Sequence, residues 1–174
     1  VGTSSSGSST TDDESAVSDA METTQTLFVR AYLYADAGGS TGNEYDLELT
    51  LEDPPVCAAD GFEENDSDAA PAPITAGTHA SLNVCDDDED YYSIALSAGQ
   101  VLQVNPTFTH AEGDVDAYIV DPNGTQVAAG VSTDDDEDFT WTAATAGTYL
   151  VRVKLYNDLG TTFGNSYTLN LTVQ

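Results

Sequence analysis

The sequence predicts an all-β protein, an antiparallel β-sandwich of the jelly-roll or immunoglobulin-like kind, and three observations support this prediction. Apolar and polar side chains alternate along short segments such as 91–96 and 167–173, as in strands with one buried face. Glycine- and proline-containing turn sequences separate these segments. A 29-residue stretch also occurs twice along the chain, which indicates more than one copy of a single unit.

Each predicted strand is bounded by a turn sequence. Asp121-Pro122-Asn123-Gly124 is the clearest turn, because proline sets φ at the second position and Asn-Gly tolerates the left-handed conformations that reverse a chain. Eight short strands at such spacing are typical of a sandwich. They are expected at residues 80–85, 90–96, 100–108, 115–121, 125–129, 138–143, 147–156 and 165–173.

The repeat gives the domain organisation. With a shift of 122 positions, Thr23–Leu51 aligns without a gap on Thr145–Val173, and 14 of the 29 pairs are identical. A period of this length suits tandem globular domains. Residues 54–174 are therefore expected to form a complete sandwich. Residues 1–53 are expected to be the C-terminal strands of a preceding copy, with a boundary at Asp53-Pro54-Pro55, since prolines do not join a central strand.

Such a partial copy cannot bury its apolar face alone, because an isolated pair of strands is marginal in water. It must pack on the front half of its own repeat, on residues 54–174, or on another molecule. We therefore expect assembly by strand complementation, with copies of the chain or neighbouring repeats as partners. A chain that opens within a repeat also leads us to expect a signal peptide upstream.

The charge balance excludes several classes of partner. The chain contains three lysines and arginines in total and 31 aspartates and glutamates, which gives a net charge of −28. Binding to nucleic acid or to an anionic membrane surface is not expected, because phosphate contacts require cations that the chain lacks. No run of about 18 apolar residues is available for membrane insertion. Metal cations, extracellular proteins and polysaccharides remain compatible partners.

Cys57 and Cys85 are the two cysteines, and neither belongs to a zinc-binding or CxxC motif. We interpret them as a disulfide, which would place the chain in an oxidising, extracellular or cell-surface environment. The alternative is a pair of buried free thiols.

No sequence motif predicts an enzyme. HExxH and GxxxxGK[ST] motifs are missing, and His79 and His110 have no nucleophile motif nearby. The acidic runs at residues 12–14 and 134–138 are interpreted as solvated loops.

An ordered series of motifs resembles the bacterial pre-peptidase C-terminal (PPC) domain, a β-sandwich appended to many secreted proteases and surface proteins. The cysteine pair resembles the disulfide-bearing form found in secreted proteins of myxobacterium-like bacteria. The motifs that carry the resemblance are Phe62–Ser67, Asp87–Tyr92, Leu96–Gly99, Gly113–Tyr118, Asp121–Gly124, Ala146–Val153 and Tyr167–Leu169.

The resemblance also implies a calcium site. Collagen-binding relatives carry calcium in a similar place, and oxygen ligands of this kind suit Ca²⁺. The matching positions here are Glu63, Asn65, Asp66, Asp87 and Asp90. One departure is Glu64, which stands where the family has proline. The alternative is that these carboxylates accept hydrogen bonds from turn amides.

Three functions follow. The first is a structural or adhesive repeat of a large secreted or surface protein or fibre, without catalytic activity. The second, which the resemblance implies, is a substrate-anchoring or processing module beside a secreted protease or other hydrolase. The third is a protein- or glycan-binding module. The fold by itself does not choose among them.

Overall fold

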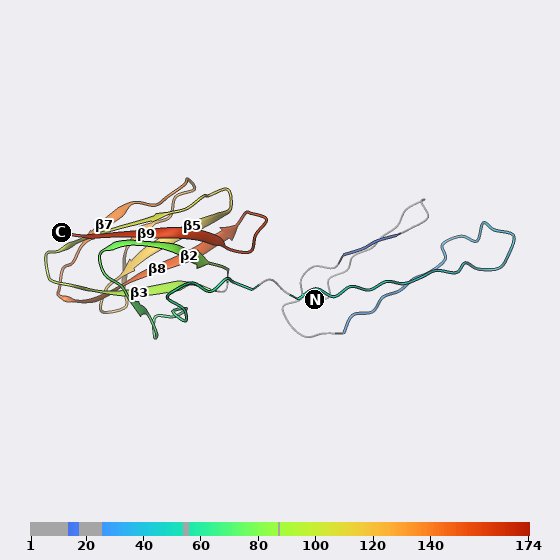
Figure 1. The fold of residues 1–174 in the computed structure, drawn as a ribbon, viewed down its shortest axis with the longest axis horizontal. Helices are drawn as coiled ribbons and strands as arrows, with labels where there is room; N and C mark the ends of the chain where they lie inside the picture. The colour runs from blue at the N-terminus through green and yellow to red at the C-terminus, as the bar shows by residue number, and fades with distance from the viewer. Residues whose placement is uncertain (1–13, 18–25, 54–55, 87) are drawn as a thin grey trace. The chain divides into compact units, whose positions relative to one another are not determined.

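A computed structural model of the chain describes residues 14–17, 26–53, 56–86 and 88–174 (Figure 1). The chain divides into two compact units, Val1–Pro54 and Pro55–Gln174. None of the described residues is helical. Among them, no helix is long and apolar enough to cross a bilayer.

The second unit is built from short strands that follow the alternation in the sequence. Eight of them lie within three residues of the bounds predicted above. The two-residue β1 was not predicted, because two residues show no alternation. The strands are β1 (Ala72–Pro73), β2 (Gly77–Val84), β3 (Asp90–Leu96), β4 (Val101–Thr107), β5 (Gly113–Val120), β6 (Gln126–Gly130), β7 (Phe139–Thr142), β8 (Gly147–Asp158) and β9 (Asn165–Val173).

These strands form two sheets, ordered β1-β3-β8-β5-β6 and β2-β9-β4-β7. Every pairing is antiparallel except the short β1–β3 pair. The predicted antiparallel β-sandwich is therefore confirmed for this unit. β8 lies between β3 and β5, while β9, the next strand along the chain, lies between β2 and β4 in the other sheet. The β8–β9 connection thus passes from one sheet to the other.

The core lies between the sheets, and alternation explains which side chains enter it. In β8, Val151 and Val153 are fully buried, whereas the intervening Arg152 is half-buried. In β9, Leu169 is buried in the same way. Each large apolar side chain removed from water contributes roughly 1.5–3 kcal/mol, so this two-sided core is the main source of stability.

The turn predicted at Asp121-Pro122-Asn123-Gly124 joins β5 to β6. Gly124 has a φ of 80°, the left-handed region expected there. Oδ1 of Asp121 accepts hydrogen bonds from the backbone nitrogens of Asn123 and Thr125, both at 2.9 Å. These bonds lower the pKa of the Asp121 carboxyl.

The first unit differs from its copy. Within residues 26–53 no residue is assigned to a strand, whereas the counterparts in the second unit form β8 and β9. Strands require hydrogen-bonded neighbours, and β8 and β9 obtain theirs from β2, β3, β4 and β5. The prediction that residues 1–53 are the last strands of a repeat stays a prediction.

Candidate metal centre

The candidate site lies where the 60–66 loop meets the segment leading into β3. The predicted disulfide is present: Cys57 and Cys85 are bonded, with their Cα atoms 5.9 Å apart. Next to it, Asp60 Oδ2 accepts a hydrogen bond from the backbone nitrogen of Asn83, at 3.1 Å. These links hold the loop against the end of β2. Two acidic segments that are distant in the sequence therefore come together.

Asn65 is the most buried polar residue of this site, with 0% of its surface exposed. Its Nδ2 donates to Asp90 Oδ1 at 3.2 Å, and its carbonyl oxygen accepts from the backbone nitrogen of Tyr91 at 2.9 Å. Its Oδ1, however, accepts no hydrogen bond from the described residues. A buried acceptor without a donor costs free energy, roughly 1–3 kcal/mol, unless another group meets it.

Carboxylates gather in two groups that share Glu63, and one of these groups contains Asp90, the hydrogen-bond partner of Asn65. The first group is Asp60, Glu63 and Asp90, and the second is Glu63, Asp66 and Asp88. Within each group the ligand oxygens lie within 4.8 Å of one another. Oε1 of Glu63 is buried and has no hydrogen-bond partner among the described residues.

The two groups differ in how far hydrogen bonds already occupy their oxygens. Asp60 accepts backbone hydrogen bonds on both oxygens, from Phe62 at 2.8 Å and from Asn83 at 3.1 Å. Asp90 accepts from Asn65 and from the hydroxyl of Tyr167. The second group is more open, since Asp66 is exposed and Glu63 and Asp88 are half-buried. That group is the better cation site.

Burial and mutual repulsion oppose the charged forms of these groups. Desolvation, followed by repulsion from Asp88, Asp60 and Asp66, raises the pKa of Glu63 to about 7. Desolvation likewise raises the pKa of Asp90 to about 7, although the Tyr167 hydroxyl acts in the opposite direction. The pKa of Asp88 is also raised, mainly by burial. A bound cation would relieve both effects.

Asp90 also anchors a chain of hydroxyl groups in the core. Tyr167 of β9 donates to Asp90, and the Tyr167 and Tyr92 hydroxyls are 2.7 Å apart. Burial, followed by the nearby Asp90 charge, raises the pKa of both tyrosines, which are therefore neutral hydrogen-bond donors. The acidic loop is thus connected to both sheets.

The residues present fit a calcium ion, because several carboxylate oxygens converge and the neighbouring Asn65 has a buried amide oxygen without a hydrogen-bond donor. The structure brings Glu63, Asn65, Asp66 and Asp90, four of the predicted ligands, into this small region. Asp87, the fifth, lies outside the described residues. Asp60 and Asp88 were not predicted. Asp88 lies inside the acidic run that the sequence analysis identified. Asp60 lies three residues before Glu63, and nothing else in the sequence marks it as a ligand.

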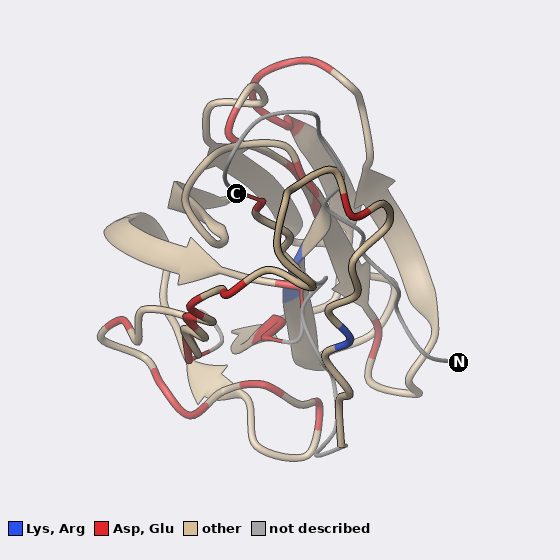
Figure 2. Ribbon diagram, turned by 90° about the vertical axis from the view of Figure 1, so that its right-hand side faces the viewer, with Lys and Arg blue, Asp and Glu red and all other residues tan. Residues whose placement is uncertain are grey.

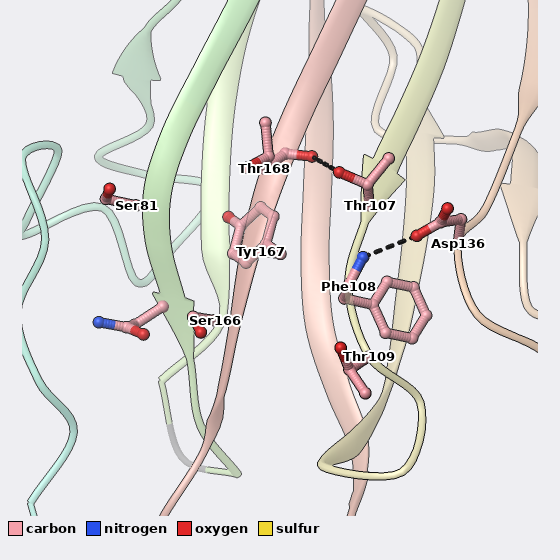
Figure 3. A pocket seen from close by; sticks show the side chains of 9 residues that line it. Ser81, Thr107, Phe108, Thr109, Asp136, Ser166, Tyr167 and Thr168 are labelled. Carbon is pink, nitrogen blue, oxygen red and sulfur yellow. Dashed lines mark hydrogen bonds between the residues drawn. The ribbon is translucent and has the colours of Figure 1, made fainter.

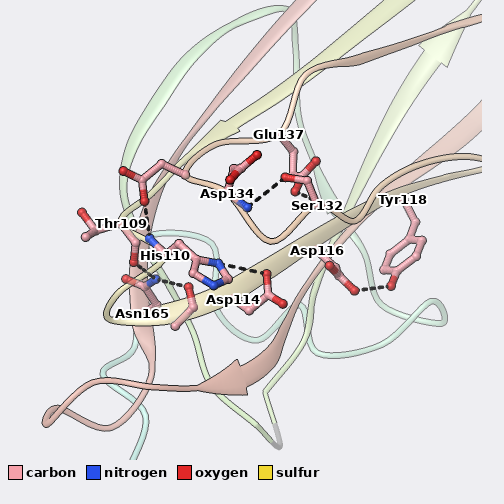
Figure 4. A network of polar contacts seen from close by, with 11 residues as sticks. Thr109, His110, Asp114, Asp116, Tyr118, Ser132, Asp134, Glu137 and Asn165 are labelled. Atoms are coloured by element: carbon pink, nitrogen blue, oxygen red, sulfur yellow. Dashed lines mark hydrogen bonds and ion pairs between the residues drawn. The ribbon is translucent and has the colours of Figure 1, made fainter.

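A second polar cluster surrounds β5 and the 132–137 loop (Figure 4). Asp136 Oδ1 accepts from the Phe108 backbone nitrogen at 2.8 Å, and Asp135 Oδ1 from that of His110 at 2.7 Å. Glu137 Oε1 accepts from the Ser132 nitrogen at 2.7 Å. This acidic run therefore ties loops together rather than being purely solvated. None of its described residues belongs to a group of three carboxylates, histidines or cysteines whose ligand atoms all lie within 4.8 Å of one another.

The histidines form no nucleophile–base pair within the described chain. His79 Nε2 lies 2.9 Å from the carbonyl oxygen of Thr75, and the His79 ring packs edge-on against Phe62. His110 Nδ1 lies 3.4 Å from the carboxylate of Asp114 (Figure 4). Both contacts hold the histidine rings against neighbouring residues of the fold.

A shallow groove of about 650 Å³ runs over β2, β4 and β9 (Figure 3). Its lining is rich in hydroxyl groups and neither histidine contributes to it. Such a surface can hydrogen-bond a polar ligand but offers no general base paired with a nucleophile. The lining residues are Ser81, Asn83, Thr107, Phe108, Thr109, Asp136, Ser166, Tyr167 and Thr168.

Acidic residues, red in Figure 2, lie mainly on loops and strand ends, and basic residues, blue, are few. Arg152 forms an ion pair with Glu89. Its guanidinium donates two hydrogen bonds to Glu89, at 2.5 and 2.7 Å, and lies over the rings of Tyr91 and Tyr118. This pairing lowers the pKa of the Glu89 carboxyl.

Residues 88–155 match the family model of the bacterial pre-peptidase C-terminal domain. A search of curated proteins finds no match. One similar solved structure is the pre-peptidase C-terminal domain of collagenase from Bacillus anthracis. It shares 16% identity over 57% of this chain and 92% of that one, with a TM-score of 0.47.

Another is the periplasmic g-type lysozyme inhibitor PliG from Aeromonas hydrophila. It shares 15% identity over 59% of this chain and 94% of that one, with a TM-score of 0.44. The family match confirms the resemblance predicted from the sequence. The matched residues, 88–155, lie within the antiparallel β-sandwich of the second unit, and they resemble the bacterial pre-peptidase C-terminal domain.

Proposed function

We propose that this chain is a non-catalytic, extracellular repeat module with a structural or adhesive role in a larger secreted or surface protein or fibre, and that calcium stabilises it. The observation that carries the proposal is the internal repeat, in which 14 of 29 aligned residues are identical. Tandem copies of one domain make a protein longer and multiply its binding surfaces, but they do not create an active site. The family match and the disulfide support an extracellular place for it.

Calcium would be held by Glu63, Asp66 and Asp88, with the free Asn65 oxygen and Asp90 beside them. The bound ion would supply positive charge where desolvation and repulsion now raise carboxyl pKa values. It would also cross-link the 60–66 loop to the segment entering β3. Extracellular calcium modules bind with Kd values of about 10⁻⁴–10⁻³ M.

Thermal unfolding of the full chain in chelator and in calcium tests this part of the proposal. At ten times Kd, calcium should stabilise the folded state by about 1.4 kcal/mol, which raises the Tm. The D66N/D88N variant should lose this shift. The D68N/D134N variant removes the same charge from exposed carboxylates outside both groups and should keep it. An unchanged Tm of the wild-type chain at millimolar calcium would refute the calcium site.

The alternative function is a substrate-anchoring or processing module appended to a secreted protease or other hydrolase. The family match favours it, because domains of this family are commonly attached to secreted proteases. Co-sedimentation of the full chain with insoluble collagen and with polysaccharides separates the two. A repeat that contacts only neighbouring modules should stay in the supernatant, whereas saturable binding that survives high salt would favour the anchoring role over a purely structural one.

A further inference from the structure

Residues 26–51 of the first unit correspond to the part of the second unit that forms β8 and β9. The correspondence follows from the 122-residue register, in which 13 of these 26 positions are identical. Among the described residues of the first unit, no strand lies beside this stretch, whereas β8 and β9 have neighbours on both sides.

The connection between the two segments already has the same local structure in both units. In the first, Asp36 Oδ2 accepts a hydrogen bond from the Gly42 nitrogen at 3.0 Å. In the second, Asp158 Oδ2 accepts from the Gly164 nitrogen at 3.0 Å. Gly42 has a φ of 84° and Gly164 a φ of 82°. The loop that carries the chain from one sheet to the other is thus formed in both.

The apolar face is buried in one unit and exposed in the other. Five positions that are at most 3% exposed in β8 and β9 are at least 51% exposed in the first unit. Charged or polar residues alternate with them in both copies. The pairs are Val29 and Val151, Leu33 and Leu155, Tyr45 and Tyr167, Leu47 and Leu169, and Leu49 and Leu171.

The second unit shows what covers such a face. β8 pairs with β3 and β5, and β9 pairs with β2 and β4. These four strands all belong to residues 77–120. They also bring the carboxylates that meet the repeated polar groups: Glu89 binds Arg152, the counterpart of Arg30, and Asp90 accepts from Tyr167, the counterpart of Tyr45.

The described residues contain one set of strands β2–β5 and two segments of the β8–β9 kind. An exchange of strands between two copies of these described residues would leave one such segment of each copy uncovered, and the bound segment would gain no contacts that the displaced one does not lose.

We propose that residues 26–51 are a donor of the last two strands to a second sandwich, and that their partner is a polypeptide segment equivalent to residues 56–122 of this chain. The partner is thus a β1–β5 strand set that lacks its own last strands. This inference rests on the repeat-module function proposed above and names the surface through which successive modules join.

The test uses the full chain and, as the probe, a polypeptide of residues 56–122. The two are mixed at micromolar concentration and followed by native mass spectrometry and amide hydrogen exchange. A 1:1 complex is expected, with exchange in residues 29–34 and 45–50 slowed at least ~100-fold. Exchange in the counterparts within β8 and β9 should not change.

Two matched variants test whether the partner contacts the apolar face of residues 26–51. Leu49→Asp should weaken binding by more than ~30-fold, because the counterpart of Leu49 is buried and a charge there would be desolvated. Thr50→Asp adds the same charge at a position whose counterpart, Thr172, is exposed, and should weaken binding less than ~3-fold.

If the free polypeptide of residues 56–122 is insoluble, a fusion protein provides the same test. Residues 56–122 placed directly before Val1 restore the 122-residue register, and residues 26–51 of the fusion should become protected, with a second cooperative unfolding transition. The proposal is overturned if neither arrangement protects residues 26–51. It is also overturned if the chain alone protects them, as a monomer or as a dimer. Neither failure alters the calcium response of the second unit, so the two proposals fail separately.

Discussion

Nδ2 of Asn65 donates a hydrogen bond to Asp90 Oδ1 at 3.2 Å and so joins an acidic loop to the first residue of β3. Asp90 is 1% exposed and accepts a further hydrogen bond from Tyr167 of β9. One carboxylate therefore connects the loop with both sheets of the sandwich. This contact joins the loop that carries the candidate metal centre to the core of the fold.

Asn65→Ala should lower the free energy of unfolding by about 2–3 kcal/mol. The change removes a buried donor from Asp90 and leaves a small cavity at a fully buried position. Denaturant unfolding measures the loss. Asn157→Ala, at an exposed position, serves as the control and should change stability by less than about 0.5 kcal/mol. Equal effects of the two variants would contradict the structural role of Asn65.

In the presence of chelator, the Tm should fall as the pH is raised from about 4.5 to 7. Glu63 and Asp90 have pKa values of about 7 in the folded state, above their ordinary values of 4.5 and 3.8. The folded state therefore binds protons more tightly than the unfolded state, and this stabilisation is lost as the pH rises to 7. Glu89 contributes oppositely, because Arg152 lowers its pKa.

Two controls isolate the site in that experiment. Glu63→Gln should reduce the decline, since one of the two groups no longer titrates. Calcium should reduce or reverse the decline, because a cation favours the charged carboxylates. A Tm that is independent of pH over this range in chelator would contradict the raised pKa values.

Replacing both cysteines, C57S/C85S, should destabilise the second unit by about 3–4 kcal/mol, as expected for a bond that closes a ring of 28 residues. It should also weaken calcium binding, because the bond holds the 60–66 loop near Asp88. Calorimetry of the oxidised wild type and the variant, with and without calcium, measures both effects. Retained calcium affinity in the folded variant would show that the loop needs no such tether.

Gly164→Ala should cost several kcal/mol more than Gly99→Ala. Both glycines have left-handed φ angles, 82° and 86°, so both substitutions carry a similar backbone cost of about 1 kcal/mol. A Cβ on Gly164 would also meet Cys85 and lie 2.8 Å from the Val84 carbonyl oxygen, whereas at Gly99 nothing lies within 4 Å. Thermal unfolding of the two variants compares these costs directly. Similar Tm values would show that the space beside the disulfide can widen.

Alternation and turn chemistry are local properties, so the sequence by itself determined the strands of the second unit to within three residues, the Asp121–Gly124 turn and the sandwich class. The interpretation of Cys57 and Cys85 as a disulfide is confirmed, although the sequence left two free thiols as the alternative. The acidic segments around Glu63 and Asp90 were likewise visible as clusters of oxygen ligands.

Tertiary structure decided which strands are neighbours and which carboxylates meet. The order β1-β3-β8-β5-β6, the parallel β1 pair and the approach of Asp60 and Asp88 to Glu63 arise from contacts between segments far apart in the chain. The raised pKa values arise from burial, which sequence spacing does not reveal. The same reason explains why equivalent apolar residues of the repeat are core in β8 and β9 and exposed at 26–51: a strand acquires its environment from its neighbours.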